Sequence, residues 1–244
     1  CSVSWNDQKK PIIPDPIDPS KYEPNNSPAG TADERKLLME SIQPYLDANS
    51  SIPLSTPCSL PNAIVNLDTV PGKTAYRRQY HIPIAYEAKL KEQVDQWLHD
   101  GVIEVAPIDT EWNSSILFVK KKDPQGNYTG DVRPCIDPRH INKLLVKQDR
   151  FPLPLIQELF DKLSKNKWFT TLDLKQAFHR FAINPSDRCK TAFTHAGRQY
   201  QFRHASFGLA PVSALVQRVL SSLFHDLDYV TLFVDDITIG TTDD

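Results

Sequence analysis

The sequence lacks an apolar run long enough to cross a membrane. Its longest stretches without a charged residue, such as residues 205–217, reach about a dozen residues, against ~18 for a membrane span. The start shows no charged segment followed by an apolar run, so no secretory signal is visible. With 40% hydrophobic and 24% charged residues, the composition excludes a collagen-like, coiled-coil or fully disordered chain. The length of 244 residues predicts one or two domains.

Cysteine is scarce and scattered. Cys1, Cys58, Cys135 and Cys189 lie far apart and form no C-x-x-C pair, which argues against a disulfide framework and a Cys-rich zinc site. A reduced intracellular compartment is therefore expected. The chain begins with Cys rather than Met, so we expect an internal piece of a polyprotein.

A net positive charge is also missing. The total of −2 speaks against a free-standing nucleic-acid binder, but the distribution is uneven. Residues 73–186 carry 18 basic and 14 acidic side chains, a net +4, and residues 118–147 hold 7 basic against 3 acidic ones. This segment predicts either a phosphate-binding surface beside a metal site or an ordinary solvated charged face.

The prolines gather near the start, because 11 of the 20 fall in the first 71 residues. Residues 11–30 read as a linker, followed by one helix that Thr31 or Asp33 can cap. From residue 76 the pattern predicts mixed elements without regular alternation, which is an α+β class. The expected helices cover 85–100, 154–165 and 212–225, and the expected strands cover 102–106, 115–121, 132–136, 168–174, 178–183, 190–195, 199–204, 229–234 and 237–240.

Three carboxylates stand out against apolar surroundings. Asp235 and Asp236 form a two-residue link between two apolar strands, where a hairpin favours Asn-Gly or Asp-Gly. Asp173 ends another apolar strand, where an unpaired charge is costly. Taken alone, the Asp235-Asp236 pair could be a structural turn, and Asp173 could be a satisfied core Asp or a helix cap. Together, carboxylates from two strands can hold two Mg²⁺ ions ~3.5–4 Å apart, as in two-metal phosphoryl transfer.

Several short motifs follow one another in the chain, namely Val119-Lys-Lys-Lys-Asp, Arg133-Pro-Cys-Ile-Asp-Pro-Arg with Asn142, Phe151-Pro-Leu-Pro, Thr171-Leu-Asp-Leu-Lys-Gln-Ala-Phe-His, Lys190-Thr-Ala-Phe, Phe207-Gly-Leu and Phe233-Val-Asp-Asp. In this order and spacing they resemble the reverse transcriptases of gypsy-type LTR retrotransposon polyproteins. The resemblance covers roughly residues 65–241. It implies that Asp173, Asp235 and Asp236 are the catalytic triad and hold two Mg²⁺ ions, for which Mn²⁺ can substitute.

The resemblance also implies a nucleotide-binding set. Lys121 and Arg133 would bind the incoming triphosphate, one as a point charge and the other as a planar fork. Phe178 would be the steric gate against a ribose 2′-hydroxyl, with plain core packing as its alternative. Phe207 and Gly208 would line the nucleotide and template side of the pocket.

Some positions depart from the family pattern or have no single assigned role. Arg139 and Asn142 would be structural or template-strand contacts. Pro211 stands at a helix entry where the family carries an amide, and Ser206 stands where the family has Pro. A Pro in the first turn of a helix is tolerated, so these changes leave the metal site intact.

By resemblance, the fold is a polymerase right hand without a thumb, with a split β-α-β, ferredoxin-like palm. We expect a Pro-rich linker with one helix over 1–75, fingers over 76–147 and 182–210, and palm over 148–181 and 211–244. The implied partners are dNTPs, an RNA or DNA template with its primer, and the thumb, RNase H and integrase of a Pol polyprotein, with no membrane. The implied location is cytoplasmic, in virus-like particles, with a nuclear phase.

Three functions follow from these residues. The first is an Mg²⁺-dependent, RNA-directed DNA polymerase. The second is a catalytically decayed remnant that only binds nucleic acid, which the altered segment around Pro211 and the mildly acidic charge motivate. The third, an RNA-templated RNA polymerase, is disfavoured by the aromatic Phe178 and by Val234 in the Asp-Asp motif.

Overall fold

The computed structural model describes residues 31–242, apart from residues 54, 124, 147, 148 and 150. The chain divides into two compact units, residues 1–51 and residues 52–244. The linker predicted over residues 11–30 lies outside the described residues. None of the helices within the described ranges is long and apolar enough to cross a membrane.

The first unit contains the predicted helix, α1 (Ala32–Ser50). Thr31 caps it through a reciprocal pair of hydrogen bonds with Glu34: the Glu34 N–H donates to Thr31 Oγ1 at 3.3 Å, and the Thr31 N–H donates to Glu34 Oε2 at 2.6 Å. This capping box satisfies two N–H groups that a helix start leaves without partners. Thr31, rather than Asp33, is therefore the cap.

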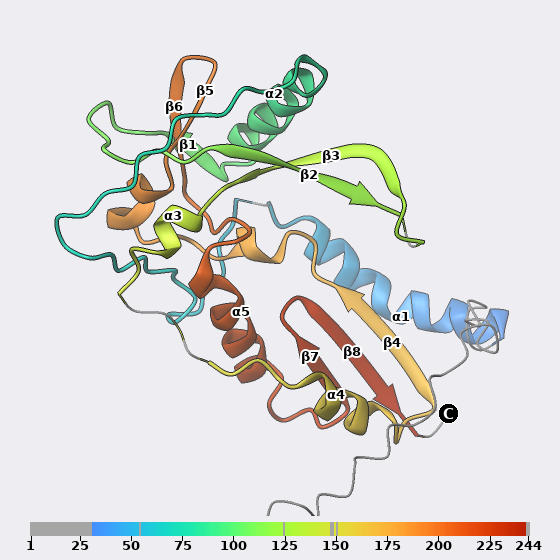
Figure 1. Cartoon of the computed structure of the whole chain (residues 1–244). Helices are drawn as coiled ribbons and strands as arrows, with labels where there is room; N and C mark the ends of the chain where they lie inside the picture. Colours follow the sequence, from blue (N-terminus) through green and yellow to red (C-terminus); the bar gives the residue numbers. More distant parts are fainter. Residues whose placement is uncertain (1–30, 54, 124, 147–148, 150, 243–244) are drawn as a thin grey trace, which may run out of the picture. The chain divides into compact units, whose positions relative to one another are not determined.

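The second unit mixes helices with three small antiparallel sheets, so the predicted α+β class is confirmed (Figure 1). Its elements in chain order are α2 (Ile84–His99), β1 (Ile103–Val105), β2 (Ile116–Lys122), β3 (Tyr128–Ile136), α3 (Arg139–Asn142), α4 (Ile156–Leu163), β4 (Trp168–Asp173), the 3₁₀ helices η2 (Ala177–Arg180) and η3 (Pro185–Thr191), β5 (Phe193–His195), β6 (Arg198–Phe202), α5 (Ala210–Leu223), β7 (Val230–Phe233) and β8 (Asp236–Thr241).

The aromatic part of the core lies between α2 and the β1-β6-β5 sheet. Leu90, Val94 and Trp97 recur on one face of α2 and are all buried. The Trp97 ring meets Phe202 and Phe193 edge-on, with centroids 5.3 and 6.3 Å apart. Edge-to-face packing is a favourable arrangement of aromatic rings. It therefore ties the helix to the sheet.

The sheet that carries the predicted triad has the order β4-β8-β7. In its antiparallel register, Leu172 is opposite Ile237 and Asp173 is opposite Asp236. In Figure 1, α5 lies beside this sheet and α4 lies near its lower end. β4 is an edge strand, and all six of its residues are exposed. The sheet therefore presents Asp173 at an open end, beside the β7–β8 turn.

Residues 52–75, expected within the linker, are part of the second compact unit. Val65 and Leu67 are buried in its core. The Val65 N–H donates to the Ala182 carbonyl at 2.8 Å. The buried Asp187 accepts the Leu67 N–H at 2.8 Å, and Lys190 donates to the Leu67 carbonyl at 2.6 Å. Distant polar groups thus hold this segment through its backbone, which its loop-like composition did not indicate.

The strand expected over residues 178–183 is not formed. The structure has the 3₁₀ helix η2 there, immediately after Gln176, whose φ is +53°. Ala177, Phe178 and His179 are all buried. Burial of three consecutive side chains explains the apolar character of the segment without the alternation of a strand, since a tight helical turn can bury neighbours that a strand sends to opposite faces.

A buried histidine makes the stability of the fold sensitive to acid. Burial lowers the pKa of His204 to about 4. The folded protein then binds this proton less readily than the unfolded chain, so stability falls as the pH drops from about 6.5 towards 4. We expect a loss of about 2 kcal/mol in the free energy of unfolding over this window from His204 alone. Urea denaturation at several pH values measures it.

The variant His204→Leu isolates this contribution, because it replaces the titrating ring with an uncharged side chain of similar size. Its stability is expected to vary less between pH 6.5 and 4 than that of the parent. The matched variant His99→Leu changes an exposed histidine and is expected to keep the parental pH dependence. Equal pH dependence in all three proteins would contradict the prediction.

Candidate active site

The turn between β7 and β8 differs by one residue from the expected one. Phe233 pairs with Asp236, so Val234 and Asp235 form the two-residue loop and Asp236 is the first residue of β8. Val234 has a φ of +56°, the region that the first central position of a type II′ hairpin turn requires. A β-branched residue is strained there. The positive φ thus falls on Val234, and Asp235 sits at the apex of the hairpin.

Gln217 of α5 holds this strained turn. The Val234 N–H donates to Gln217 Oε1 at 2.7 Å, and Gln217 Nε2 donates to the Leu232 carbonyl at 3.4 Å. The Gln217 side chain is buried among apolar positions of α5 such as Val216 and Leu220. Sequence reasoning missed this residue, although a lone amide on the apolar face of a predicted helix was the signal that could have found it.

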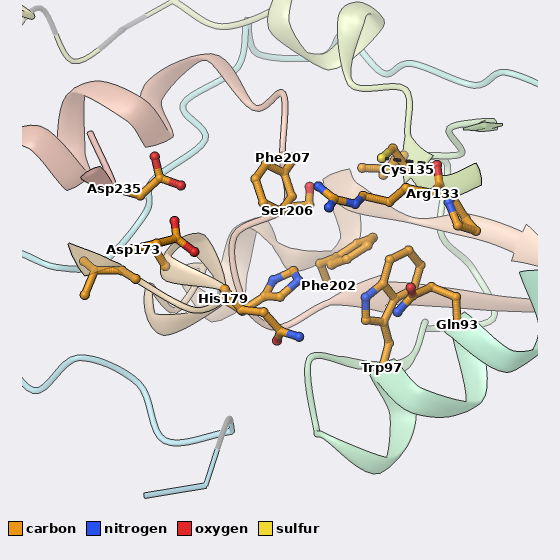
Figure 2. Close-up of a pocket in the computed structure, with 15 residues that line it drawn as sticks. Gln93, Trp97, Arg133, Cys135, Asp173, His179, Phe202, Ser206, Phe207 and Asp235 are labelled. Carbon is orange, nitrogen blue, oxygen red and sulfur yellow. Dashed lines mark hydrogen bonds between the residues drawn. The ribbon is translucent and has the colours of Figure 1, made fainter. Parts of the chain in front are cut away.

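Two carboxylates share a cavity of about 350 Å³. Asp173 ends β4 and Asp235 follows β7, and both line the cavity. Figure 2 shows their carboxylates close together at one end of it. Asp236 is the cross-strand partner of Asp173 but is not among the lining residues of the described chain. The structure thus brings two members of the predicted triad to the cavity and places the third beside them.

A cationic and aromatic wall stands next to the carboxylates. Arg133 of β3 and Phe207 line the same cavity, and the Arg133 guanidinium carbon lies 6.0 Å from the centre of the Phe207 ring (Figure 2). Such a cation–π contact orients the planar guanidinium. Phe178, the predicted gate, is buried and packs on Phe207 with ring centroids 4.7 Å apart. Phe178 is not among the described lining residues, and it contacts the cavity wall through its packing on Phe207.

Lys121 lies outside the described lining of the cavity and already has an anionic partner. Its Nζ contacts Asp131 Oδ2 at 2.5 Å across the β2–β3 hairpin. This ion pair holds the pKa of the Asp131 carboxyl below its usual range. The lysine that was predicted to bind the triphosphate is therefore paired with Asp131 in this structure.

Gly208 has a structural reason to be glycine. Its φ is +88°, and a Cβ at this position would lie 3.0 Å from Cγ of Pro138. Asn142 fixes the same loop: its Nδ2 donates to the Gly208 carbonyl at 2.8 Å, and its Oδ1 accepts the Ala210 N–H at 3.0 Å. An amide from a distant helix thus binds the entry of α5, where Pro211 sits in the first turn.

Arg139 also makes a structural contact. Its Nε donates to Asp137 Oδ1 at 2.8 Å and its terminal nitrogen to Oδ2 at 2.6 Å. The Asp137 side chain is buried, and this bidentate pair holds the pKa of its carboxyl below the usual range. Of the two roles left open for Arg139 and Asn142, the contacts seen are structural.

Two polar side chains on the cavity wall were not predicted as site residues. His179 Nδ1 lies 2.9 Å from the Ala205 carbonyl oxygen. Because a carbonyl oxygen only accepts, Nδ1 carries the proton and donates it. Burial lowers the pKa of His179, which favours the neutral ring. Ser206 is buried against the same cavity, and its Oγ has no hydrogen-bond partner among the described residues. The wall therefore offers polar atoms to a ligand.

The donor set suits a hard divalent cation. Among the described residues no three His, Cys, Asp or Glu side chains are grouped closely enough to enclose a metal ion. Mg²⁺ does not need such a cage, because it is usually bound by one or two carboxylates together with water and substrate phosphates. Asp173 and Asp235 meet that requirement. Asp236 lies opposite Asp173 in the sheet and follows Asp235 in the chain.

Comparison with known proteins identifies the class to which this fold and site belong. The family model described as "Reverse transcriptase (RNA-dependent DNA polymerase)" matches residues 119–244. The foamy viral protease-reverse transcriptase in complex with double-stranded DNA has a similar fold, with a TM-score of 0.74 and 23% identity over 93% of this chain and 38% of that chain. The chain belongs to the reverse transcriptase family, and its fold is the polymerase right hand.

The relatives agree with the gypsy-type resemblance. The Pol polyprotein of transposon 297 from Drosophila melanogaster is 30% identical over 72% of this chain and 16% of that polyprotein. The Pol polyprotein of transposon gypsy from the same organism is 28% identical over 98% of this chain and 21% of that polyprotein. The chain thus spans about a sixth to a fifth of the length of these relatives.

The hydrogen bond from Val234 to Gln217 gives a stability prediction. Gln217→Leu keeps the size of the side chain but leaves the Val234 N–H without its acceptor, which costs about 1–3 kcal/mol. Urea denaturation should show a drop in the free energy of unfolding of that size. The control Gln96→Leu removes an exposed amide of α2 that donates a hydrogen bond to Asp100. It should change the free energy of unfolding by less than about 0.5 kcal/mol. Equal losses of unfolding free energy in Gln217→Leu and Gln96→Leu would contradict a stabilising role for the hydrogen bond at the turn.

Proposed function

We propose that this chain is the polymerase module of a gypsy-type retroelement, an RNA-directed DNA polymerase that transfers dNMP to a primer 3′-hydroxyl. One observation carries the proposal: Asp173, Asp235 and Arg133 line one cavity in a chain of the reverse transcriptase family. Carboxylates for metal ions and a guanidinium for phosphate are the groups that nucleotidyl transfer needs.

The proposed roles follow from where each group lies. The family implies a divalent metal requirement, and Asp173, Asp235 and Asp236 would hold two Mg²⁺ ions. Ions held by these carboxylates would supply charge that favours loss of the proton from the primer 3′-hydroxyl and that stabilises the pyrophosphate leaving group. In the reaction, the 3′-oxygen forms a bond to the α-phosphorus and the bond to the pyrophosphate oxygen breaks.

The chain's own residues orient the nucleotide. Arg133, steadied by the Phe207 ring, would bind the triphosphate with its planar fork. Lys121 would add a second cation after it leaves Asp131. Phe178, packed on Phe207, would set the depth of the sugar pocket through that ring, with Gly208 on the template side. These substrate roles are inferred from the resemblance together with the cavity.

The partners are proposed from the relatives. A similar solved structure is that of a foamy viral protease-reverse transcriptase in complex with an RNA/DNA hybrid. We infer that an RNA or DNA template with its primer, dNTPs and the other parts of a Pol polyprotein are the partners of this chain. The cytoplasmic location stays a prediction.

Primer extension on an RNA template tests the activity directly. The parent should extend the primer with dNTPs in the presence of Mg²⁺, and Asp235→Asn should reduce the rate by at least about 10³-fold, because one metal ligand is lost. The control Asp228→Asn alters an exposed acid near the other end of β7 and should extend as the parent does. Equal extension by the parent and Asp235→Asn would contradict the metal role. A folded parent that binds primer–template without extending it, even when the thumb of the polyprotein is supplied, would establish the non-enzymatic alternative.

The sugar gate has a separate test. Phe178→Val replaces the ring that packs on Phe207 with a smaller side chain, so we expect rNTP use relative to dNTP use to rise about tenfold or more. Loss of the buried ring also lowers stability by about 2–4 kcal/mol, so incorporation is measured well below the melting temperature of the variant. A control variant, Phe181→Val, alters a neighbouring buried ring and should lose stability without relaxing sugar choice. An unchanged rNTP to dNTP ratio in Phe178→Val would refute the gate.

A further inference from the structure

The β2–β3 hairpin carries four cations, of which Arg133 lines the proposed nucleotide site, and each has a partner within the chain. Lys120 and Lys122 each place Nζ 5.3 Å from the centre of the Tyr128 ring. Arg133 lies over Phe207. Among the residues that the structure describes, Lys121 is the one of the four that pairs with a carboxylate, that of Asp131. Within the same residues, the ring contacts of Lys120, Lys122 and Arg133 leave the charges of these side chains uncompensated, whereas Asp131 neutralises Lys121.

The backbone of the hairpin presents Asp131 to Lys121. Lys120 pairs with Val132 and Lys122 pairs with Tyr128, so Lys121 lies opposite residues 129–131, a bulge in β3. Gly130 in that bulge has a φ of +83° and open space around its Cα. The Val132 N–H donates to Asp131 Oδ1 at 2.8 Å, while Oδ2 accepts from Lys121 at 2.5 Å. Both carboxylate oxygens of Asp131 therefore accept hydrogen bonds within the hairpin.

The pair also lies on the functional face of the hairpin. Asp131 and Arg133 are two residues apart on β3, so their side chains project from the same face of the strand. Arg133 on that face lines the cavity with Asp173 and Asp235. A phosphate chain bound by Arg133 would therefore reach the place where the Asp131 carboxylate now contacts Lys121.

We propose that Asp131 is a phosphate-mimicking latch on Lys121, which a phosphate group of the substrate must displace before Lys121 can bind it. The Lys121 and Asp131 side chains are 45% and 42% exposed, so the pair is solvent-screened and contributes little to stability. A weak, exposed pair is easily exchanged for a triphosphate of higher charge. Ligands with too little charge to displace Asp131 would leave Lys121 neutralised, so the latch raises selectivity for polyphosphates.

The identity of the phosphate rests on the proposed polymerase function, whereas the latch itself does not. The position of Arg133 favours the triphosphate of the incoming nucleotide. A backbone phosphate of the template is the other source of the same chemistry. Binding of inorganic tripolyphosphate tests the latch without catalysis, and primer extension then distinguishes the two sources.

The binding experiment uses the whole chain and calorimetric titration with tripolyphosphate at 0.15 M salt, where charges more than about 8 Å apart are largely screened. Asp131→Asn should bind about two- to fivefold more tightly than the parent, the range expected for an exposed ion pair. The control Asp123→Asn makes the same charge change on the same hairpin, at a carboxylate that accepts from Asn127 instead of Lys121. It should bind as the parent does.

A double variant closes the argument. In a Lys121→Met background, Asp131→Asn should give no gain in tripolyphosphate affinity, because there is no lysine left to release. The latch is overturned if Asp131→Asn binds as the parent does, if Asp123→Asn gains as much, or if the gain persists without Lys121.

Steady-state primer extension identifies the phosphate. If the nucleotide displaces Asp131, then Asp131→Asn should lower the KM for dNTP two- to fivefold with kcat unchanged, and leave primer–template affinity as in the parent. A gain in primer–template affinity with an unchanged KM would assign the contact to the template backbone and overturn the nucleotide as the displacing ligand. A chain that extends no primer even when the thumb of the polyprotein is supplied would refute the proposed function, while the tripolyphosphate result still decides the latch.

Discussion

The antiparallel pairing of β4 with β8 is the constraint on which the site depends. Its register sets Asp173 opposite Asp236 and so carries the β7–β8 turn to the end of β4. Because the hairpin is closed by only two residues, the strain of a positive φ falls on Val234. Gln217 then has to satisfy the Val234 N–H, which fixes α5 against the same turn. One register therefore determines the placement of two strands, one helix and the acidic end of the cavity.

Much of this arrangement could be predicted from local pattern. The apolar spacing of α2 and α5 and the β2–β3 hairpin follow from periodicity, because each element buries one face. Asp173 and Asp235 were recognisable because carboxylates interrupt apolar strands. Their proximity, however, came from the family resemblance, since no local pattern specifies how distant strands pair.

The parts that escaped prediction depend on contacts between distant residues. Residues 52–75 resemble a linker in composition, yet Asp187 and Lys190 hold the backbone of Leu67 in the core. The turn at Gln176 replaces an expected strand with η2. Phe178 illustrates the limit for sites: its ring is buried and packs on Phe207, whose ring also lies 6.0 Å from the guanidinium carbon of Arg133. Such layering cannot be read from spacing.

The open edge of β4 affects how the protein behaves at high concentration. Every residue of this strand is exposed, including the large apolar side chains of Phe169 and Leu172, which are 51% and 48% exposed. An uncovered edge strand offers unpaired N–H and C=O groups to a second chain, and apolar side chains on it strengthen such pairing. The strand that ends in Asp173 thus also offers a second chain a surface for self-association, which a charged residue in place of Leu172 would disfavour.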